Sequence, residues 1–226
     1  MEVALFDYGA GNLHSLKKGL EAGGAHVTVT TRWDEALARD ALVLPGVGSF
    51  GAAVQALAGH EDRVRGALED GLPCLGICLG MQLFFRESEE GSGQGIGLIP
   101  GRVRRIRART IPQMGWNDVE ARVDPGVEAR VEPGVETGAD PEVQAGATLD
   151  PLLRGIGPFT AYYANSFVCD PEADETIIAR SLYEDEMFVA AVRQGRSWGV
   201  QFHPEKSSAP GLHLLRNFLT EVEVAT

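Results

Sequence analysis

A cysteine stands at the point where a buried strand is predicted to turn into a helix. Cys78 is the centre of Gly76-Ile77-Cys78-Leu79-Gly80, which follows the apolar run Pro73–Ile77 and precedes Met81–Phe85, where we expect a helix to begin. Small residues on both sides of a nucleophile are typical of a nucleophile elbow, because larger side chains would clash in so tight a turn. A thiol at a helix N-terminus is shifted toward the thiolate, which can attack a carbonyl carbon.

A histidine and a glutamate stand two residues apart far downstream, in Gln201-Phe202-His203-Pro204-Glu205. Pro204 favours an extended conformation in the residue before it, and residues two apart in an extended segment share a face. Glu205 would then accept a hydrogen bond from one ring nitrogen of His203 and leave the other for Cys78. Each motif taken alone also suits a packing turn or a surface turn. Together they predict a catalytic triad of Cys78, His203 and Glu205.

Size and charge narrow the class of protein. A chain of 226 residues favours one large domain over two small ones. The net charge of −12 disfavours nucleic acid as a partner, because phosphate binding needs a basic field. Nothing approaches 18 consecutive apolar residues, so we expect no membrane span. Residues Met1–Asp7 lack the basic and apolar regions of a signal peptide and predict a first strand.

The three cysteines argue against a disulfide framework and for a reducing compartment, so we expect a cytoplasmic protein. Cys74 and Cys78 are four residues apart, and only Cys169 remains. A zinc site would lack thiolates, and the five histidines do not cluster around them, so we expect no metal.

Apolar strands alternate with amphipathic helical patterns through the first ninety residues. This alternation predicts an α/β fold with an open, mainly parallel central sheet that helices cover on both faces. Catalytic groups in such folds lie at the carboxyl ends of the strands. The predicted strands are Val3–Phe6, Val27–Thr30, Leu42–Leu44 and Pro73–Ile77, and the predicted helices are Leu13–Ala22, Phe50–Leu57, Arg63–Asp70 and the one after Cys78.

The second half of the chain has the pattern of an antiparallel extension to this sheet. A hairpin turn is expected at Gln194-Gly195, and a last helix from about Gly211 to Val222. Pro112–Asn117 is predicted to be a loop, in which Trp116 would serve a binding surface. The predicted strands here are Gly101–Arg107, Phe159–Val168, Thr176–Tyr183, Phe188–Arg193 and Ser197–Phe202.

An acidic repeat with a period of eight interrupts this pattern: VEARVDPG, VEARVEPG, VETGADPE. Each unit carries a proline, so no unit can extend a helix or a long strand. We interpret residues 119–148 as a low-complexity insertion in a single domain that spans 1–226, and favour a solvated loop over a partner-binding extension.

Three motifs together resemble those of the class I, triad-type glutamine amidotransferases. They are Pro45-Gly46-Val47-Gly48-Ser49-Phe50, the elbow from Gly76 to Gln82, and His203-Pro204-Glu205-Lys206-Ser207. The resemblance covers nearly the whole chain except the repeat. It implies that Cys78 attacks the side-chain amide of L-glutamine, with His203 as proton carrier and Glu205 as its orienting group, and that no cofactor is needed.

The same resemblance assigns binding roles to further positions. Backbone N–H groups near Val47, in the loop that begins at Gly46, and of Leu79 would stabilise the oxyanion, as a tetrahedral intermediate requires. Gly48, Gln82 and Glu90 match positions that hold the substrate glutamine. Asn165 and Phe167 stand where the family often has His and Tyr.

One branch of the family is especially similar, namely the glutaminase subunits of imidazole glycerol phosphate synthase, from histidine biosynthesis. The similarity lies in Asp7–Leu13, the Pro-Gly-Val-Gly loop, Pro112–Asn117 and the segment from His203 to Ser208. It implies a heterodimer with a cyclase, which is a (β/α)8 barrel that receives the ammonia and makes imidazole glycerol phosphate and aminoimidazole carboxamide ribotide. Trp116, Asn117 and Lys206 would lie at that interface.

Two other functions stay open from the sequence. One is a glutaminase subunit of another synthase, from the pyridoxal phosphate, anthranilate or purine pathways, against which the loop at Trp116 argues. The other is a non-catalytic, redox-sensing relative in which Cys78 is oxidised. Such a sensor has no need of a base and its orienting group, so His203 and Glu205 argue against it.

Overall fold

The computed structural model describes residues 1–9, 13–122 and 149–224. Within these ranges the largest element is a nine-stranded sheet with the strand order β2-β1-β3-β4-β12-β11-β10-β7-β8. The first part of the sheet is parallel, as the alternation of strands and helices predicts. It comprises β2 (His26–Thr30), β1 (Glu2–Phe6), β3 (Ala41–Leu44), β4 (Cys74–Ile77) and β12 (Ser197–Val200).

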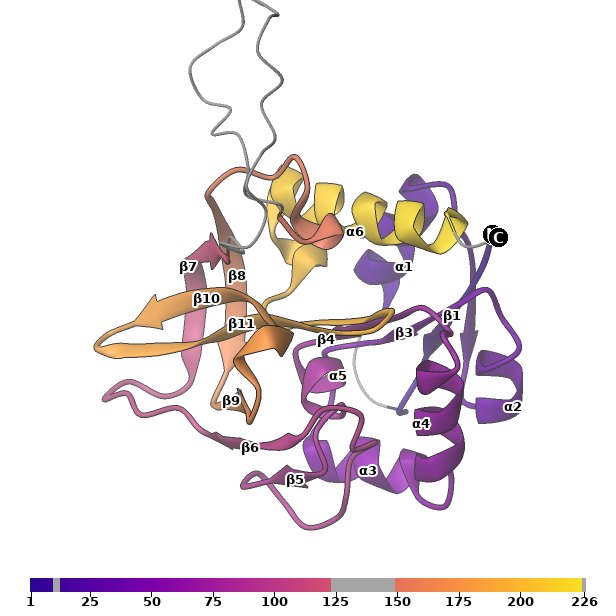
Figure 1. Cartoon of the computed structure of the whole chain (residues 1–226), viewed down its shortest axis with the longest axis horizontal. Helices are drawn as coiled ribbons and strands as arrows, with labels where there is room; N and C mark the ends of the chain where they lie inside the picture. Colours follow the sequence, from indigo (N-terminus) through magenta and orange to yellow (C-terminus); the bar gives the residue numbers. More distant parts are fainter. Residues whose placement is uncertain (10–12, 123–148, 225–226) are drawn as a thin grey trace, which may run out of the picture.

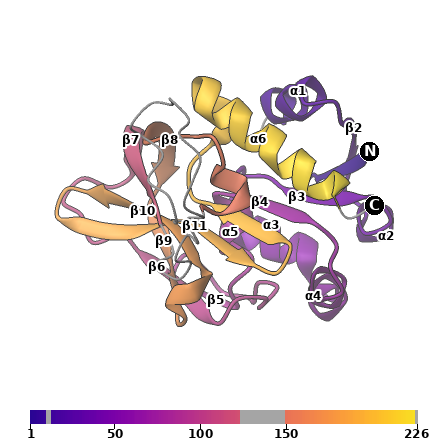
Figure 2. The same ribbon diagram turned by 45° about the horizontal axis from the view of Figure 1, so that its top comes forward.

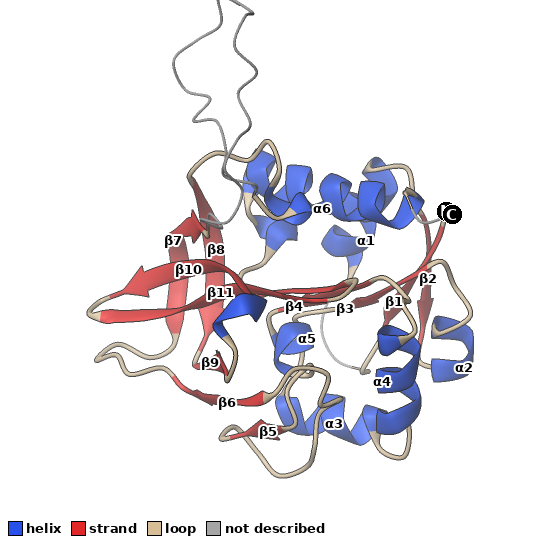
Figure 3. Cartoon of the chain, in the orientation of Figure 1, coloured by secondary structure: helices blue, strands red, loops and turns tan. Residues whose placement is uncertain are grey.

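The second part of the sheet is antiparallel and extends it away from β12 (Figure 3). It comprises β11 (Glu186–Gln194), β10 (Ile177–Tyr183), β7 (Gln113–Ala121) and β8 (Phe159–Asn165). A smaller sheet lies beside it and is made of β5 (Glu87–Ser88), β6 (Gly101–Arg105) and β9 (Phe167–Pro171).

Helices cover both faces of the parallel part (Figures 1 and 2). One face carries α1 (His14–Ala22) and α6 (Ser208–Glu223), and the other carries α3 (Phe50–Leu57), α4 (Glu61–Glu69) and α5 (Leu79–Gln82). The short elements are α2 (Trp33–Ala36) and the 3-10 helices η1 (Pro151–Leu153), η2 (Asp174–Thr176) and η3 (Pro204–Lys206). The predicted fold class is therefore confirmed. None of the helices in the described ranges is long and apolar enough to cross a bilayer.

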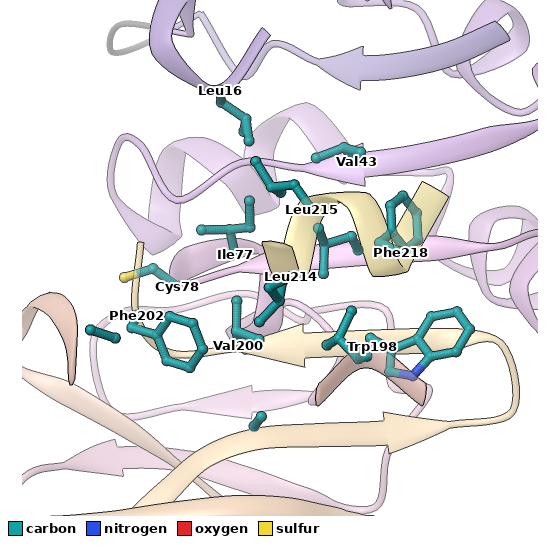
Figure 4. Close-up of a cluster of buried hydrophobic side chains, with 14 of the residues drawn as sticks. Leu16, Val43, Ile77, Cys78, Trp198, Val200, Phe202, Leu214, Leu215 and Phe218 are labelled. Carbon is teal, nitrogen blue, oxygen red and sulfur yellow. The ribbon is translucent and has the colours of Figure 1, made fainter. Parts of the chain in front are cut away.

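Successive residues of the central strands point into two separate cores, one on each face of the sheet. Along β1, Val3 and Leu5 enter the core under α1 and α6, and Phe6 enters the opposite core, where its ring stacks on Trp33. Each such buried side chain contributes about 1.5–3 kcal/mol. Figure 4 shows the first core, with Leu214 beside the central strands. These two cores hold β4 and β12 rigidly, which matters because the site lies at their ends.

Two of the boundaries that the structure corrects lie beside the site. The predicted strand Phe159–Val168 is two strands, because the chain breaks at Ser166 and continues as β9 in the smaller sheet. The helix after Cys78 is a single turn, α5, and does not run on through Phe85. The pattern of apolar residues does not show where a strand or helix changes its hydrogen-bonding partners, so it could not predict these two boundaries.

The prediction of a loop around Trp116 was wrong, because the segment is strand β7. β7 pairs with β8 from Gln113 to Val119, with Trp116 opposite Tyr162. These cross-strand pairs outweigh the local preference of the flanking proline and glycine for a turn. Residues 119–121 of the repeat end β7, whereas 123–148 lie outside the described residues.

Candidate active site

Cys78 lies in a strained turn between β4 and α5. Its φ of 49° and ψ of −103° are unusual for a residue with a side chain. A Cβ on Gly80 would lie 2.0 Å from the carbonyl oxygen of Leu44, and a Cβ on Gly76 would lie 2.6 Å from the carbonyl oxygen of Gly80. The two flanking glycines are therefore required by sterics, as the elbow motif predicts. Figure 4 shows the sulfur directed away from the apolar core.

Parallel pairing of β4 with β12 brings the two distant motifs together. Ile77 is the register partner of Val200, so the residues that follow each strand emerge at the same edge of the sheet. The backbone N–H of Cys78 donates to the carbonyl of Val200 at 2.6 Å, which extends the ladder to the elbow itself. His203 follows three residues after Val200 and reaches the same edge.

The His203 ring is fixed by Glu205. Its Nδ1–H donates to Oε1 of Glu205 at 2.9 Å, and both side chains are less than a tenth exposed. His203 is extended, with φ −103° and ψ 96°, as predicted for a residue before proline, but the extended segment ends there: Pro204–Lys206 is a 3-10 turn that returns the carboxylate to the ring. Ser207 anchors this turn, because its hydroxyl donates to the carbonyl of His203 at 2.6 Å and accepts from the backbone N–H of Tyr162 at 2.9 Å.

The ring of His203 and the side chain of Cys78 are close neighbours. Burial by itself lowers the pKa of His203, but the hydrogen bonds and charges of Cys78 and Glu205 raise it to about 9. An imidazolium beside a sulfur stabilises the thiolate, so the three groups can act as a charged Cys–His pair with an orienting carboxylate.

Gly46 packs directly against this pair. A Cβ on Gly46 would lie 2.8 Å from the Cβ of Cys78 and 2.9 Å from Cε1 of His203. No side chain fits between the loop after β3 and the two reacting groups. The loop backbone is therefore within reach of whatever Cys78 binds.

A small cavity of about 190 Å³ opens onto the sulfur. Cys78 and Leu79 form its base, the loop after β3 one wall, and the break between β8 and β9 another. Most of the residues predicted to bind the substrate or the oxyanion line this cavity. The lining residues are Gly46, Gly48, Cys78, Leu79, Gln82, Glu90, Ala164, Asn165, Ser166 and Phe167.

The wall after β3 is the loop in which the sequence predicts the oxyanion donors. Val47 is half-buried and precedes Gly48, whose φ of +98° is a conformation that favours glycine. Glu90 also lines the cavity, is exposed, and accepts from the backbone N–H of Phe50, the residue that follows this loop, at 3.5 Å. A carboxylate at this position can bind an ammonium group.

Two of the three predicted interface residues, Trp116 and Lys206, meet at Tyr162 beside the His203 turn, and Trp116 and Asn117 lie in a strand and not in a loop. The ring of Trp116 is 55% exposed and packs edge-on against Tyr162, 6.2 Å between centroids. The Lys206 ammonium lies 5.5 Å from the same Tyr162 ring. Asn117 donates to the carbonyl of Leu182 at 2.9 Å and so ties β7 to β10.

The other two cysteines are buried and free. Burial raises the pKa of Cys74 far above its ordinary value. Burial also raises the pKa of Cys169, as do the neighbouring Cys78 and Asp170. Of the three thiols, only Cys78 lines the cavity.

Sequence reasoning missed two residues that the structure places against the triad. Ser207 holds the 3-10 turn, and Gln201 lies fully buried with its amide nitrogen 3.5 Å from the sulfur of Cys78. Both residues lie in the segment 201–207 around His203, and their closeness to His203 in the sequence could have suggested that they contact the triad.

The family description that matches this chain is "Glutamine amidotransferase class-I", over residues 4–222. A protein of Gloeobacter violaceus named imidazole glycerol phosphate synthase subunit HisH is 41% identical over 96% of this chain and 88% of its own length. Proteins of the same name are 38% identical in Synechococcus elongatus, over 99% and 95% of the two chains, and 36% identical in Natronomonas pharaonis, over 96% and 94%.

Solved structures with the same fold are more distant in sequence. A structure described as a glutamine amidotransferase has a TM-score of 0.69 at 21% identity and covers 98% of this chain and 99% of its own. A structure described as a putative GMP synthase component from Thermoplasma acidophilum has a TM-score of 0.70 at 18% identity, over 100% and 95% of the two chains. These two similarities concern the fold alone.

Proposed function

Since the chain belongs to the class I glutamine amidotransferase family and its HisH relatives match over nearly their full length, we propose that it is the glutaminase subunit of imidazole glycerol phosphate synthase. It hydrolyses L-glutamine to glutamate and ammonia for histidine biosynthesis. The proximity of Cys78, which lines the cavity, to the Glu205-oriented ring of His203 supports this proposal most directly. The three free thiols also suit a cytoplasmic location.

In the proposed mechanism, the thiolate of Cys78 attacks the amide carbon of the glutamine side chain. Backbone N–H groups near Val47 and of Leu79 stabilise the resulting oxyanion. His203 passes its proton to the leaving nitrogen, the C–N bond breaks, and a thioester and ammonia form. Water, deprotonated by His203, then attacks the thioester and releases glutamate. Glu205 keeps the ring of His203 oriented through both steps.

The substrate is held by groups around the same cavity. Glu90 is placed to bind the α-ammonium of glutamine, and Gly48 and Gln82 line the cavity walls. Asn165 is buried in the opposite wall, where it replaces a histidine frequent in the family, and its amide nitrogen donates to the carbonyl of Phe167 at 3.2 Å. The cavity suits a side chain with a terminal amide better than a large ligand.

The proposed partner is the cyclase, in a heterodimer that transfers the ammonia directly. Met114 and Trp116 are 67% and 55% exposed on one face of β7, next to the His203 turn. Exposed apolar side chains grouped beside a site mark protein interfaces. Together with Lys206 they form the surface on which we propose that the barrel sits. Asn117, the third residue predicted at this interface, follows Trp116 on the other face of β7 and bonds to β10. The domain is proposed to be single, with the repeat as its insertion.

The catalytic proposal is tested by comparing two nitrogen sources in the complex with the cyclase. Replacing Cys78 with Ala should abolish product formation from glutamine and leave product formation from free ammonia intact. Loss of both activities would assign Cys78 a structural role. The wild-type chain alone should hydrolyse glutamine weakly and gain strongly when the cyclase and its nucleotide ligand are added. Absence of any gain would argue for a different synthase.

The interface proposal is tested by measuring the affinity between the two proteins of the heterodimer. Trp116→Ala should weaken binding to the cyclase at least tenfold, as is usual for an aromatic interface anchor. Val29→Ala is the matched control, because Val29 is also exposed but lies on β2, at the opposite end of the sheet. Equal affinities for the two variants would remove Trp116 from the interface.

A further inference from the structure

A buried side-chain amide lies behind the sulfur of Cys78. Gln201 is fully buried directly after β12, and its backbone N–H donates to the carbonyl of Ala190 at 2.8 Å. Its Nε2 lies 3.5 Å from Sγ of Cys78, and its Oε1 lies 3.5 Å from Nε2 of Gln82. The backbone hydrogen bond to Ala190 anchors Gln201, so its side-chain amide lies next to the sulfur.

The orientation of the Gln201 amide follows from the backbone carbonyl of Phe167, which can only accept hydrogen bonds and is connected to Gln201 through Gln82. Nε2 of Gln82 lies 3.3 Å from the carbonyl oxygen of Phe167, so the amino side of Gln82 must face that carbonyl. The same amino group has a second hydrogen, which points to Oε1 of Gln201. The amino side of Gln201 is then left facing Cys78. Phe167 thus orients both amides, and Gln201 presents a donor to the sulfur.

Besides the Gln201 amide, which does not titrate, several titratable groups surround the sulfur. From the segment after β12, His203 lies beside it and Glu205 lies behind the ring. From β9, Cys169 is a neighbouring thiol whose pKa is raised by burial first and by Cys78 second. Glu90 lines the same cavity but is exposed to solvent. Only His203 and Gln201 offer hydrogen-bond donors to the sulfur among these described side chains.

We propose that Gln201 is a further residue of the catalytic site, whose amide N–H donates to Sγ of Cys78, favours the thiolate and holds it toward the cavity. The inference rests on the proposed role of Cys78 as nucleophile. A hydrogen bond to an anion in a buried site is stronger than one to a neutral thiol. Donation from Gln201 therefore stabilises the sulfur before attack, and again when it leaves as the thioester is hydrolysed.

The test is the pH dependence of alkylation of Cys78 by iodoacetamide in the full chain, with the modified residue identified by mass spectrometry. Gln201→Met keeps the length of the side chain and removes the donor. It should raise the midpoint of thiolate formation by about one pH unit, the equivalent of one hydrogen bond to a charged group. Gln201→Glu, a second variant of the same shape, should raise it further, because a carboxylate repels the thiolate. Ser197→Ala, on the adjoining strand β12 and equally buried, should leave the midpoint unchanged.

The outcomes separate this inference from the proposed function. A wild-type Cys78 that titrates as a reactive thiol, with the same midpoint in both Gln201 variants, would overturn the role of Gln201 and leave Cys78 as the nucleophile. A wild-type Cys78 that is never alkylated would overturn both. Thermal denaturation of each variant establishes that the folded state is what is alkylated. If one variant does not fold, the midpoint of the other decides the question.

Discussion

Replacing Gly46 with Ala should disable the site without unfolding the protein. Gly46 has no positive φ, so the backbone accepts alanine and the effect is purely steric. The added Cβ would lie 2.8 Å from the Cβ of Cys78, 2.9 Å from Cε1 of His203 and 2.9 Å from the carbonyl oxygen of Ile77 at the end of β4. Carbon atoms in contact prefer about 3.5–4.0 Å, so the two reacting groups must move by roughly 1 Å.

A misplacement of about 1 Å costs roughly 100-fold in rate, so kcat/KM for glutamine should fall about 100-fold, or about 2.7 kcal/mol. The assay is glutamine hydrolysis in the complex with the cyclase, and thermal denaturation of the isolated chain is measured in parallel. Gly51→Ala is the matched control, because a Cβ on Gly51, in α3, would meet nothing within 4 Å. It should keep full activity and gain about 0.5–1 kcal/mol of stability.

Two results would refute this reasoning. If Gly46→Ala keeps wild-type kcat/KM, the loop after β3 does not restrain the reacting groups as the distances imply. If activity falls only in proportion to the unfolded fraction, the substitution acts on stability and not on the site.

Two further predictions concern the ion pair and the elbow. The pKa of His203 is raised from 6.5 to about 9, so its protonated ring stabilises the fold fully below pH 6.5, and this contribution is lost as the pH rises through 9. Glu205→Gln should lower that pKa and flatten the loss of stability over this range; an unchanged pKa in an NMR titration of the ring would contradict it. Gly80→Ala should destabilise the chain by at least about 3 kcal/mol in urea denaturation, because its Cβ would lie 2.0 Å from the carbonyl oxygen of Leu44. In the control Gly66→Ala a Cβ meets nothing within 4 Å, and an equal loss there would show that any added methyl group is harmful.

Much of the parallel half could be predicted because its signals are local. Strands β1, β3 and β4 are short, mainly apolar runs, β2 alternates apolar and polar residues, and the helices α1 and α3 have amphipathic patterns. The elbow at Cys78 was equally visible, since the glycines on either side are a direct consequence of the turn. Local sterics and burial decide these features, and a short stretch of sequence carries both.

The antiparallel half was predicted less well because its strands depend on distant partners. Trp116 lies in a strand only because β8 pairs along β7, and the single strand expected over Phe159–Val168 divides at Ser166 because β9 pairs with β6. Neither partner is close in the sequence, so the local turn signals gave the wrong result.

The sequence by itself determined the residue types of the site: a thiol in a glycine-flanked turn, and an imidazole with a carboxylate nearby. Only the tertiary structure decided how they meet. The register of Ile77 with Val200 sets Cys78 beside His203, and a 3-10 turn, not an extended segment, returns Glu205 to the ring. The donor that Gln201 presents to the sulfur is likewise fixed by the carbonyl of Phe167 on another strand. Such contacts join residues far apart along the chain, and only packing of the whole sheet selects them.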